Sequence, residues 1–330
     1  MFENKDEWRV AVVIPAYRVT KHISEVILGI PESVSGIYVI DDACPDGTGK
    51  YVESFITDQR VRVLYLPVNQ GVGGAVMAGY RAALADHADI IVKVDGDGQM
   101  DPALIGDFIA PIISGEADYT KGNRFYDLEM IRSMPKVRIF GNAVLSLLTK
   151  LSSGYWNLFD PTNGYTAIHA DACKHLPFHK ISKRYFFETD MLFRLNTLRA
   201  LVVDVPMDAK YGEETSHLKI SKIMGEFLYK HTQNFGKRIF YNYFLRDMSL
   251  ASIQLVLGIL LTFFGVVFGG YHWLLSADVG IPASAGTVMV AAMPLLIGLQ
   301  LILSFIGYDI ASVPRRPIHR LKRIRTKSSN

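Results

Sequence analysis

The sequence predicts an α/β fold with a mostly parallel sheet, followed by amphipathic helices and two transmembrane helices. Apolar segments alternate with helix-patterned segments up to about residue 125, as in a doubly wound sheet. Residues 220–231 then repeat apolar side chains on one helical face. Finally, the uncharged runs 249–271 and 286–308 contain 23 residues each, enough to cross a hydrocarbon core of about 30 Å.

Composition supports a membrane protein. Of the 330 residues, 49% are hydrophobic, and the excess lies near the C-terminus. The alternative is two helices buried in a water-soluble core, where uncharged runs longer than about 18 residues rarely occur. No apolar segment precedes the first predicted strand, so we expect no secretory signal and a cytoplasmic N-terminal portion. Cys44 and Cys173 have neither metal-ligand spacing nor the pattern of a disulfide framework.

The net charge of +3 is unevenly distributed. Residues 314–330 hold seven Lys or Arg and no acid, whereas the link 272–285 holds one Asp and no Lys or Arg. The positive-inside rule therefore places both termini in the cytoplasm and the link outside. We expect the basic tail to rest on the anionic lipid bilayer, at about 1 kcal/mol per basic residue, rather than on nucleic acid.

The first half of the chain supplies four predicted strands and the helices between them. Each strand is a short apolar run that ends at a proline or at acidic turn residues. The predicted strands cover 9–14, 36–40, 61–66 and 89–95, with helices at 22–30 and from 72 to 84.

Acidic pairs follow two of these strands. Asp41 and Asp42 come after the second strand, and Asp95 and Asp97 come after the fourth, with glycine between them. Ligands of open α/β sheets bind outside the carboxyl ends of strands. Two carboxylates at this spacing suit a divalent cation that takes its other oxygens from water and phosphate. A phosphate-bearing donor is therefore expected here.

A glycine-rich stretch, residues 69–75, leads into the predicted helix at 72–84. It matches only half of a dinucleotide fingerprint, so it gives little support to nicotinamide binding. Its glycines allow either close approach of the backbone to a nucleotide or close packing of the helix on the sheet. Asp101 and Pro102 predict a helix start, with an N-cap followed by proline in the first turn.

The remaining candidates are charged side chains at the ends of later elements. They are Arg124 after a strand at 118–120, Arg138 in a helix at 137–151, Asp160 in a turn, Glu188 and Asp190 at a helix start, and Lys210 after a strand at 201–205. Asp160 precedes a proline, so turn formation competes with a catalytic role. Glu188 and Asp190 equally fit the first turn of a helix.

Together these segments resemble family 2 glycosyltransferases with the GT-A (Rossmann-like) fold, and among them the polyprenyl-phosphate sugar synthases, including bacterial enzymes with two transmembrane helices. Five motifs in order carry the resemblance, over roughly residues 9–216. They are Val13-Ile14-Pro15-Ala16-Tyr17, Asp41-Asp42 with Asp46-Gly47-Thr48, the glycine stretch from Asn69 to Gly79, Asp95-Gly96-Asp97-Gly98-Gln99 with Asp101-Pro102, and Gly122-Asn123-Arg124.

The resemblance implies roles for individual residues. The donor nucleotide is bound by Pro15, Ala16, Tyr17, Asp41, Asp42, Gly71, Asp95 and Gln99, and Asp95 and Asp97 hold Mg²⁺ or Mn²⁺. Arg124, Arg138 and Lys210 hold the acceptor phosphate, while Asp97, Asp160 and Arg124 are the catalytic candidates. Lys210 stands where some relatives have Arg, which leaves a solvated surface lysine as an equal alternative.

The predicted function is inverting transfer of one hexose from a UDP- or GDP-linked sugar to polyprenyl phosphate at a bacterial-type inner membrane. A membrane transferase acting on a lipid or polysaccharide hydroxyl, or a non-catalytic membrane scaffold, are the alternatives. Gly265 and Gly269 permit close helix packing, so the sequence is compatible with a homo-oligomer. The predicted regions are a catalytic domain (1–216), juxtamembrane helices (217–248), two transmembrane helices (249–271 and 286–308) with a link (272–285), and a basic tail (309–330).

Overall fold

The computed structural model describes residues 8–126, 136–208 and 220–320. The chain divides into two compact units. Unit 1 contains Met1–Phe235 together with Pro314–Asn330, and unit 2 contains Gly236–Val313. Lys210 and residues 321–330 of the basic tail lie outside the described residues.

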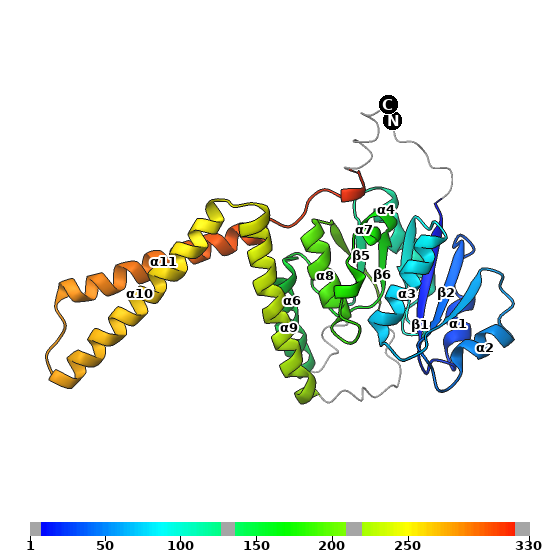
Figure 1. Ribbon diagram of the computed structural model, residues 1–330, viewed down its shortest axis with the longest axis horizontal. Helices are drawn as coiled ribbons and strands as arrows, with labels where there is room; N and C mark the ends of the chain where they lie inside the picture. Colours follow the sequence, from blue (N-terminus) through cyan, green and yellow to red (C-terminus); the bar gives the residue numbers. More distant parts are fainter. Residues whose placement is uncertain (1–7, 127–135, 209–219, 321–330) are drawn as a thin grey trace, which may run out of the picture. The chain divides into compact units, whose positions relative to one another are not determined.

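Unit 1 is built on a seven-stranded sheet with the order β3-β2-β1-β4-β6-β5-β7 (Figure 1). β6 is antiparallel to β4 and β5, and the other neighbouring strands are parallel, which confirms the mostly parallel α/β prediction. The strands are β1 (Val10–Ala16), β2 (Gly36–Asp41), β3 (Val61–Tyr65), β4 (Ile90–Lys93), β5 (Tyr119–Asn123), β6 (Thr166–His169) and β7 (Val202–Pro206).

Helices cover both faces of this sheet (Figure 1). Those of unit 1 are α1 (Ile23–Leu28), α2 (Thr48–Phe55), α3 (Val72–Ala85), η1 (Pro102–Leu104), α4 (Ile105–Ile113), α6 (Lys136–Ser153), α7 (Ala170–Lys174), η2 (Phe178–Lys180), α8 (Phe187–Leu198) and most of α9 (Ile220–Phe240). Asp101 caps η1 by accepting a hydrogen bond from the Ala103 amide, as its sequence predicts.

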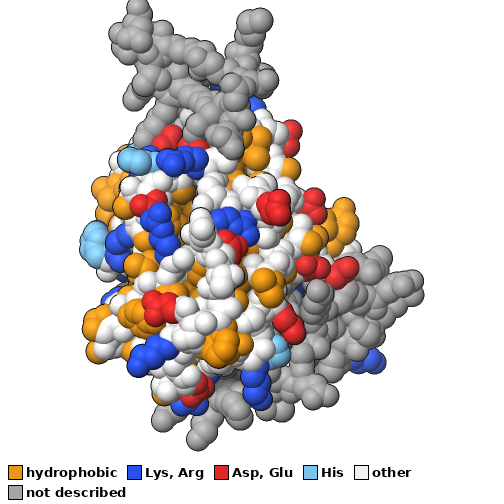
Figure 2. All heavy atoms as spheres, turned by 90° about the vertical axis from the view of Figure 1, so that its right-hand side faces the viewer, with side chains coloured by type: hydrophobic (Ala, Val, Ile, Leu, Met, Phe, Trp, Pro, Cys, Tyr) orange, Lys and Arg blue, Asp and Glu red, His pale blue; other side chains and the backbone are white. Residues whose placement is uncertain are grey.

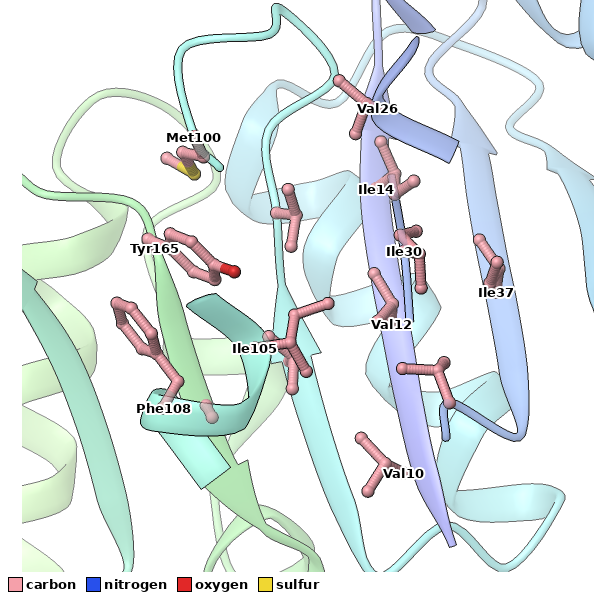
Figure 3. Close-up of a cluster of buried hydrophobic side chains, with 14 of the residues drawn as sticks. Val10, Val12, Ile14, Val26, Ile30, Ile37, Met100, Ile105, Phe108 and Tyr165 are labelled. Carbon is pink, nitrogen blue, oxygen red and sulfur yellow. The ribbon is translucent and has the colours of Figure 1, made fainter. Parts of the chain in front are cut away.

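The main core lies on one face of β1. Val12 and Ile14 pack there with Ile105 of α4, and Phe108 stacks on Tyr165 with ring centroids 3.9 Å apart (Figure 3). On the opposite face α3 approaches β1 closely, because a Cβ at Gly79 would lie 2.3 Å from a Val13 methyl group. The glycine therefore sets the spacing between helix and sheet.

Several strand bounds differ from the sequence prediction, among them the ends of β1 and β4 at the carboxyl edge of the sheet, and β5, which runs to Asn123 rather than to residue 120. β1 continues through Pro15 to Ala16, because β4 pairs with β1 only as far as Val13 and needs no amide from the proline. β4 ends at Lys93, because the chain turns at Gly96 and Gly98. The acidic pair therefore lies entirely in a loop.

Figure 2 shows the face of unit 1 at the right-hand side of Figure 1, where charged side chains of both signs are interspersed with single hydrophobic ones. Unit 2 differs in composition. Its helices α10 (Leu250–Val279) and α11 (Ala285–Ala311) are long enough to cross a membrane, and the most apolar segment of each has a mean hydropathy of 2.3. Only 22% and 11% of their most apolar segments are buried, which disfavours the alternative of two core helices.

Both helices of unit 2 are longer than the predicted spans. α10 runs on past residue 271, through most of the predicted link, and ends at Gly280 with φ +70°. The two helices approach closely where Gly265 faces α11, since a Cβ there would lie 2.8 Å from the Ala291 carbonyl oxygen. This glycine serves packing within the chain.

The chain after unit 2 belongs to unit 1. His319 is buried, and its Nδ1 lies 2.6 Å from Oδ1 of Asp118, just before β5. The His319 ring also stacks on His169 at 4.3 Å. The beginning of the predicted basic tail, up to Arg320, is thus part of unit 1.

Candidate active site

Five segments of unit 1 form a cleft of about 310 Å³ at the carboxyl edge of the sheet. It is lined by Pro15, Ala16, Tyr17, Val19, Asp42, Asn69, Gly71, Val72, Ala75, Asp95, Gly96, Asp97, Arg184 and Tyr185. Of the donor residues predicted from sequence, the cleft brings together all but Asp41 and Gln99. A larger cleft of about 560 Å³ in unit 2 has a mainly apolar lining without a carboxylate, which does not suit phosphate chemistry.

Asp95 and Asp97 occupy a tight loop after β4. A Cβ at Gly96 would lie 3.0 Å from a Val19 methyl group, so little room exists there for a side chain. Oδ1 of Asp97 accepts a hydrogen bond from the Gln99 amide at 3.0 Å, which fixes the turn. Both carboxylates therefore reach the cleft from a compact loop, while Gln99 supports that loop through its backbone.

Asp41 and Asp42 hold neighbouring loops by accepting backbone hydrogen bonds. The oxygens of Asp41 accept from the amides of Cys44 and Gly49, both at 2.7 Å. Those of Asp42 accept from the amides of Gln70 and Gly71 at 2.7 and 2.8 Å. Both side chains are buried, so they act on the shape of the cleft through the loops they fix.

The glycine stretch contacts the segment before α8. The amides of Gly73 and Gly74 donate to the Lys183 carbonyl oxygen, at 2.9 and 3.3 Å. A Cβ at Gly71, where φ is +81°, would lie 2.7 Å from the same oxygen. This contact brings Arg184 into the cleft. The sequence analysis missed Arg184, although the basic pair before the aromatic start of α8 was a visible signal.

The acceptor candidates do not form one described cluster. Asp160 is buried and pairs with Arg124, whose Nε and Nη2 donate at 2.8 and 3.0 Å. Burial raises the pKa of Asp160, but the hydrogen bonds from Arg124 and the charge of Lys121 outweigh it and hold this pKa below its usual range. Arg138 belongs to α6, but its side chain, like Lys210, lies outside the described residues.

Asp190 and Glu188, which the sequence left open, differ in their surroundings. Asp190 joins three segments, accepting hydrogen bonds from the Ser182 amide at 2.8 Å and from Nδ2 of Asn234 at 3.0 Å. Glu188 is half-buried, with 16% of its side chain exposed, and desolvation raises its pKa while the nearby Lys93 opposes the rise. Asp190 is therefore a structural residue, and Glu188 belongs to a buried charge group beneath the cleft.

Lys93, which contacts Glu188, belongs to a row of polar residues that lie opposite one another on neighbouring strands. Lys93 of β4 lies opposite Thr166 of β6, which lies opposite Lys121 of β5, and Lys121 lies opposite Asp204 of β7. Residues directly opposite each other project from the same face. Both lysines are 1% exposed. The sequence analysis missed them, although a lysine within the apolar run 90–94 is an evident signal.

The site fits a divalent metal only in part. Among the residues that the structure describes, no group of three or more His, Cys, Asp or Glu side chains could hold a metal ion. Asp95 and Asp97 offer two hard oxygen ligands. A Mg²⁺ or Mn²⁺ ion bound by two carboxylates takes its remaining ligands from water and substrate phosphates. The residues thus fit a metal that binds together with a diphosphate.

A mostly parallel α/β sheet with carboxylates at its carboxyl edge, beside a cleft, is the arrangement expected of a GT-A-like domain. The profile of glycosyl transferase family 2 matches residues 11–176, and the chain belongs to this family. It is therefore a glycosyltransferase.

Several characterised proteins are similar to this chain. The undecaprenyl-phosphate mannosyltransferase of Micrococcus luteus is 32% identical over 203 residues, which cover 60% of this chain and 82% of that protein. The UDP-N-acetylglucosamine–dolichyl-phosphate N-acetylglucosaminyltransferase of Methanococcus voltae is 29% identical, with 61% and 86% covered. The polyprenol monophosphomannose synthase of Mycolicibacterium smegmatis is 25% identical, with 66% and 82% covered.

Solved structures support the fold. Glucosyl-3-phosphoglycerate synthase from Mycobacterium tuberculosis in complex with Mg²⁺ and UDP is 19% identical, with a TM-score of 0.53 over 71% of this chain and 80% of that one. Its complex with Mn²⁺, UDP and glucosyl-3-phosphoglycerate gives 20% identity and a TM-score of 0.51, over 71% and 81%. These likenesses confirm the predicted fold and carry no further conclusion about substrates.

Proposed function

We propose that this protein transfers a single sugar from a nucleotide sugar to polyprenyl phosphate at a membrane, with inversion at the anomeric carbon. One observation carries the proposal. The catalytic unit is similar to three enzymes whose names each give a polyprenyl or dolichyl phosphate, or a polyprenol monophosphate product. The donor nucleotide is UDP or GDP.

The donor side follows from the cleft. The carboxylates of Asp95 and Asp97 would hold Mg²⁺ or Mn²⁺, which neutralises the charge that develops on the departing diphosphate. Arg184, which also lines the cleft, would supply a cation for the same phosphates. Tyr17 and the turn from Pro15 bind the base and ribose, beside the loops that Asp41 and Asp42 fix.

On the acceptor side, the protein has to position the attacking phosphate rather than remove a proton from it. A lipid phosphate is already anionic at neutral pH, whereas a sugar hydroxyl needs a base to take its proton. Asp160 is enclosed and engaged by Arg124, so its role is to orient that guanidinium toward the acceptor phosphate. Arg138 and Lys210 complete the phosphate clamp in this proposal.

The surface of unit 1 offers a place for the lipid. Helix α6 buries its polar side chains and exposes its apolar ones, the opposite of an ordinary surface helix. Ser146, Thr149 and Ser152 are buried, whereas Phe140 and Leu147 are 72% and 52% exposed. Apolar side chains held toward the solvent suit contact with acyl chains or the prenyl chain. We therefore place α6 at the membrane interface, with α10 and α11 as the anchor and the catalytic unit on the cytoplasmic side.

A transfer assay tests the proposal. Full-length protein in detergent receives undecaprenyl or dolichyl phosphate, Mg²⁺ and a panel of UDP- and GDP-linked hexoses labelled in the sugar. We expect the label to enter the organic phase as an acid-labile lipid-linked product, and EDTA to abolish this transfer.

Alternative acceptors provide the controls. Transfer to diacylglycerol or to a soluble sugar, with none to the lipid phosphates, would contradict the proposal and favour a hydroxyl acceptor. Absence of transfer, together with no metal-dependent binding of any nucleotide sugar, would favour a scaffold.

A further inference from the structure

A buried lysine lies directly beneath the acidic pair. Lys93 is the last residue of β4, and its side chain is 1% exposed. Its Nζ lies 2.8 Å from Oδ1 of Asp95, 3.0 Å from the Gly164 carbonyl oxygen and 3.7 Å from Oε1 of Glu188. The Gly164 oxygen accepts a hydrogen bond from Nζ, and the contact of Nζ with Asp95 is an ion pair. One ammonium group is therefore shared by two carboxylates.

The surrounding chain leaves room for this ammonium group and for little else. A Cβ at Gly164 would lie 2.4 Å from Nζ of Lys93 and 2.7 Å from Oδ2 of Asp95. Glu188 approaches from the first turn of α8, which is a different segment of the chain. Because a buried charge is unfavourable unless opposite charges surround it, this arrangement is a built charge group rather than a chance surface pair.

The charge group bears on the metal that the proposed function assigns to Asp95 and Asp97. Two carboxylates alone would attract any divalent cation in solution. Lys93 offsets the charge of Asp95, and Glu188 in turn draws Lys93 away from Asp95 by competing for the same ammonium. Since Coulomb energies in a shielded site are large, the balance sets the affinity for free metal.

A nucleoside diphosphate changes this balance. It brings several negative charges and phosphate oxygens that complete the coordination of the metal. We propose that Lys93 is a positioning residue that makes metal binding depend on the nucleoside diphosphate, with Glu188 tuning its strength. The metal then enters with the donor and leaves with the spent nucleotide. This inference rests on the proposed donor site.

Metal binding, measured without catalysis, tests the inference. Electron paramagnetic resonance of Mn²⁺ gives its Kd for full-length protein in detergent, alone and with UDP or GDP. We expect Lys93→Met to tighten binding of Mn²⁺ alone by about tenfold or more and to reduce the enhancement by nucleotide. In Glu188→Gln the ammonium group of Lys93 has Asp95 as its remaining carboxylate partner of the pair and offsets more of the Asp95 charge. We therefore expect Mn²⁺ binding to weaken by about threefold to tenfold.

The double variant guards against misfolding of Lys93→Met. The variant that carries both Lys93→Met and Glu188→Gln removes both charges of the pair and nearly preserves side-chain volume. Proteins commonly tolerate such a joint replacement of a buried ion pair. It must bind Mn²⁺ more tightly than Glu188→Gln does. The matched control is Lys50→Met, the same change at an exposed lysine of α2, which should leave Mn²⁺ affinity within about twofold.

Opposite effects of the two single variants support the inference, because a purely structural role would weaken binding in both. Unchanged or weaker Mn²⁺ binding in Lys93→Met, and in the double variant relative to Glu188→Gln, would overturn it while leaving the donor site intact. Wild-type protein that binds no Mn²⁺ with either nucleotide would instead overturn the donor site, and the inference with it.

Discussion

The donor half and the acceptor half of the candidate site are built differently. The donor half comes largely from loops at the ends of β1, β2 and β4, each contained in one short motif. The acceptor half combines Arg124, at the end of β5, with Asp160, which lies 36 residues further along. Its other two candidates come from α6 and from the region after β7. The donor half is local in sequence, and the acceptor half is not.

The carboxylates of the two halves differ accordingly. Asp97 lines the cleft, where a cation can reach it. Asp160 is enclosed and holds a guanidinium. Replacing an acid by its amide should reduce ligand binding directly where the acid contacts the ligand. Where the acid only orients another side chain, the loss should be smaller. The same substitution in each half therefore tests the division.

The largest effect is expected on the donor half. Asp97→Asn removes the charge of one of the two proposed metal ligands, so kcat/KM should fall by about a thousandfold or more. Steady-state transfer at saturating Mg²⁺ measures it. The matched control is Asp101→Asn, four residues along, where asparagine still caps η1 and activity should stay within about twofold. Substantial activity in Asp97→Asn would remove this residue from the metal site.

The acceptor half should respond more weakly and through the other substrate. Asp160→Asn leaves Arg124 without its buried counter-charge, so the guanidinium loses its fixed orientation. We expect kcat/KM for polyprenyl phosphate to fall by about a hundredfold, with the Kd of the nucleotide unchanged. An equal loss of nucleotide binding would show that the two halves are not separate. Arg138→Ala should likewise raise the acceptor KM alone.

The division also explains what the sequence could predict. Alternating apolar runs and acids at strand ends depend on local spacing, so the order of strands and helices and the loop of Asp95 and Asp97 follow from it. Pairs that form only when distant segments meet do not. Asp118 and His319, for example, are 201 residues apart in the sequence. Likewise, nothing in the sequence around Asp160 indicates that its carboxylate forms an ion pair with Arg124.

Lys93 represents a third case, visible in the sequence but without an evident role. A lysine in an apolar strand contradicts the pattern of that strand, and such local conflicts are typical of functional sites. Its partners, Glu188 and the Gly164 carbonyl, come from other segments. The conflict could therefore have identified the residue, but not the charge group.

A smaller effect is expected at the glycine stretch, where the start of α3 packs on the segment before α8. A Cβ at Gly73 would lie 2.5 Å from the Phe187 ring and 2.6 Å from the Ser182 carbonyl oxygen. Gly73→Ala should therefore cost about 2 kcal/mol of unfolding free energy, measured by denaturation in detergent. Gly106→Ala, in α4 with open space around it, is the control and should be neutral or stabilise by about 0.5–1 kcal/mol. Equal effects would refute the packing argument.

The smallest effect concerns the helices near the acceptor half. His231 of α9 contacts Ser152 of α6, with Nδ1 2.8 Å from Oγ. Burial lowers the pKa of His231 to about 4, from 6.5 in the unfolded chain. The unfolded state therefore binds the proton first, and the stability that this histidine contributes is present above pH 6.5 and declines as pH falls toward 4.

Between pH 6.5 and 5.5 this loss amounts to about 1 kcal/mol. Unfolding of wild-type protein and His231→Gln at both pH values isolates it, because the variant lacks the titrating ring. His175→Gln changes an exposed histidine and should retain the wild-type slope. Hydrogen exchange should locate the acid-induced opening in α6 and α9, while the loop of Asp95 and Asp97 stays protected. If the loop of Asp95 and Asp97 loses its protection from exchange at the same pH, the two halves unfold as one cooperative unit. They would then differ in their substrates but not in their stability.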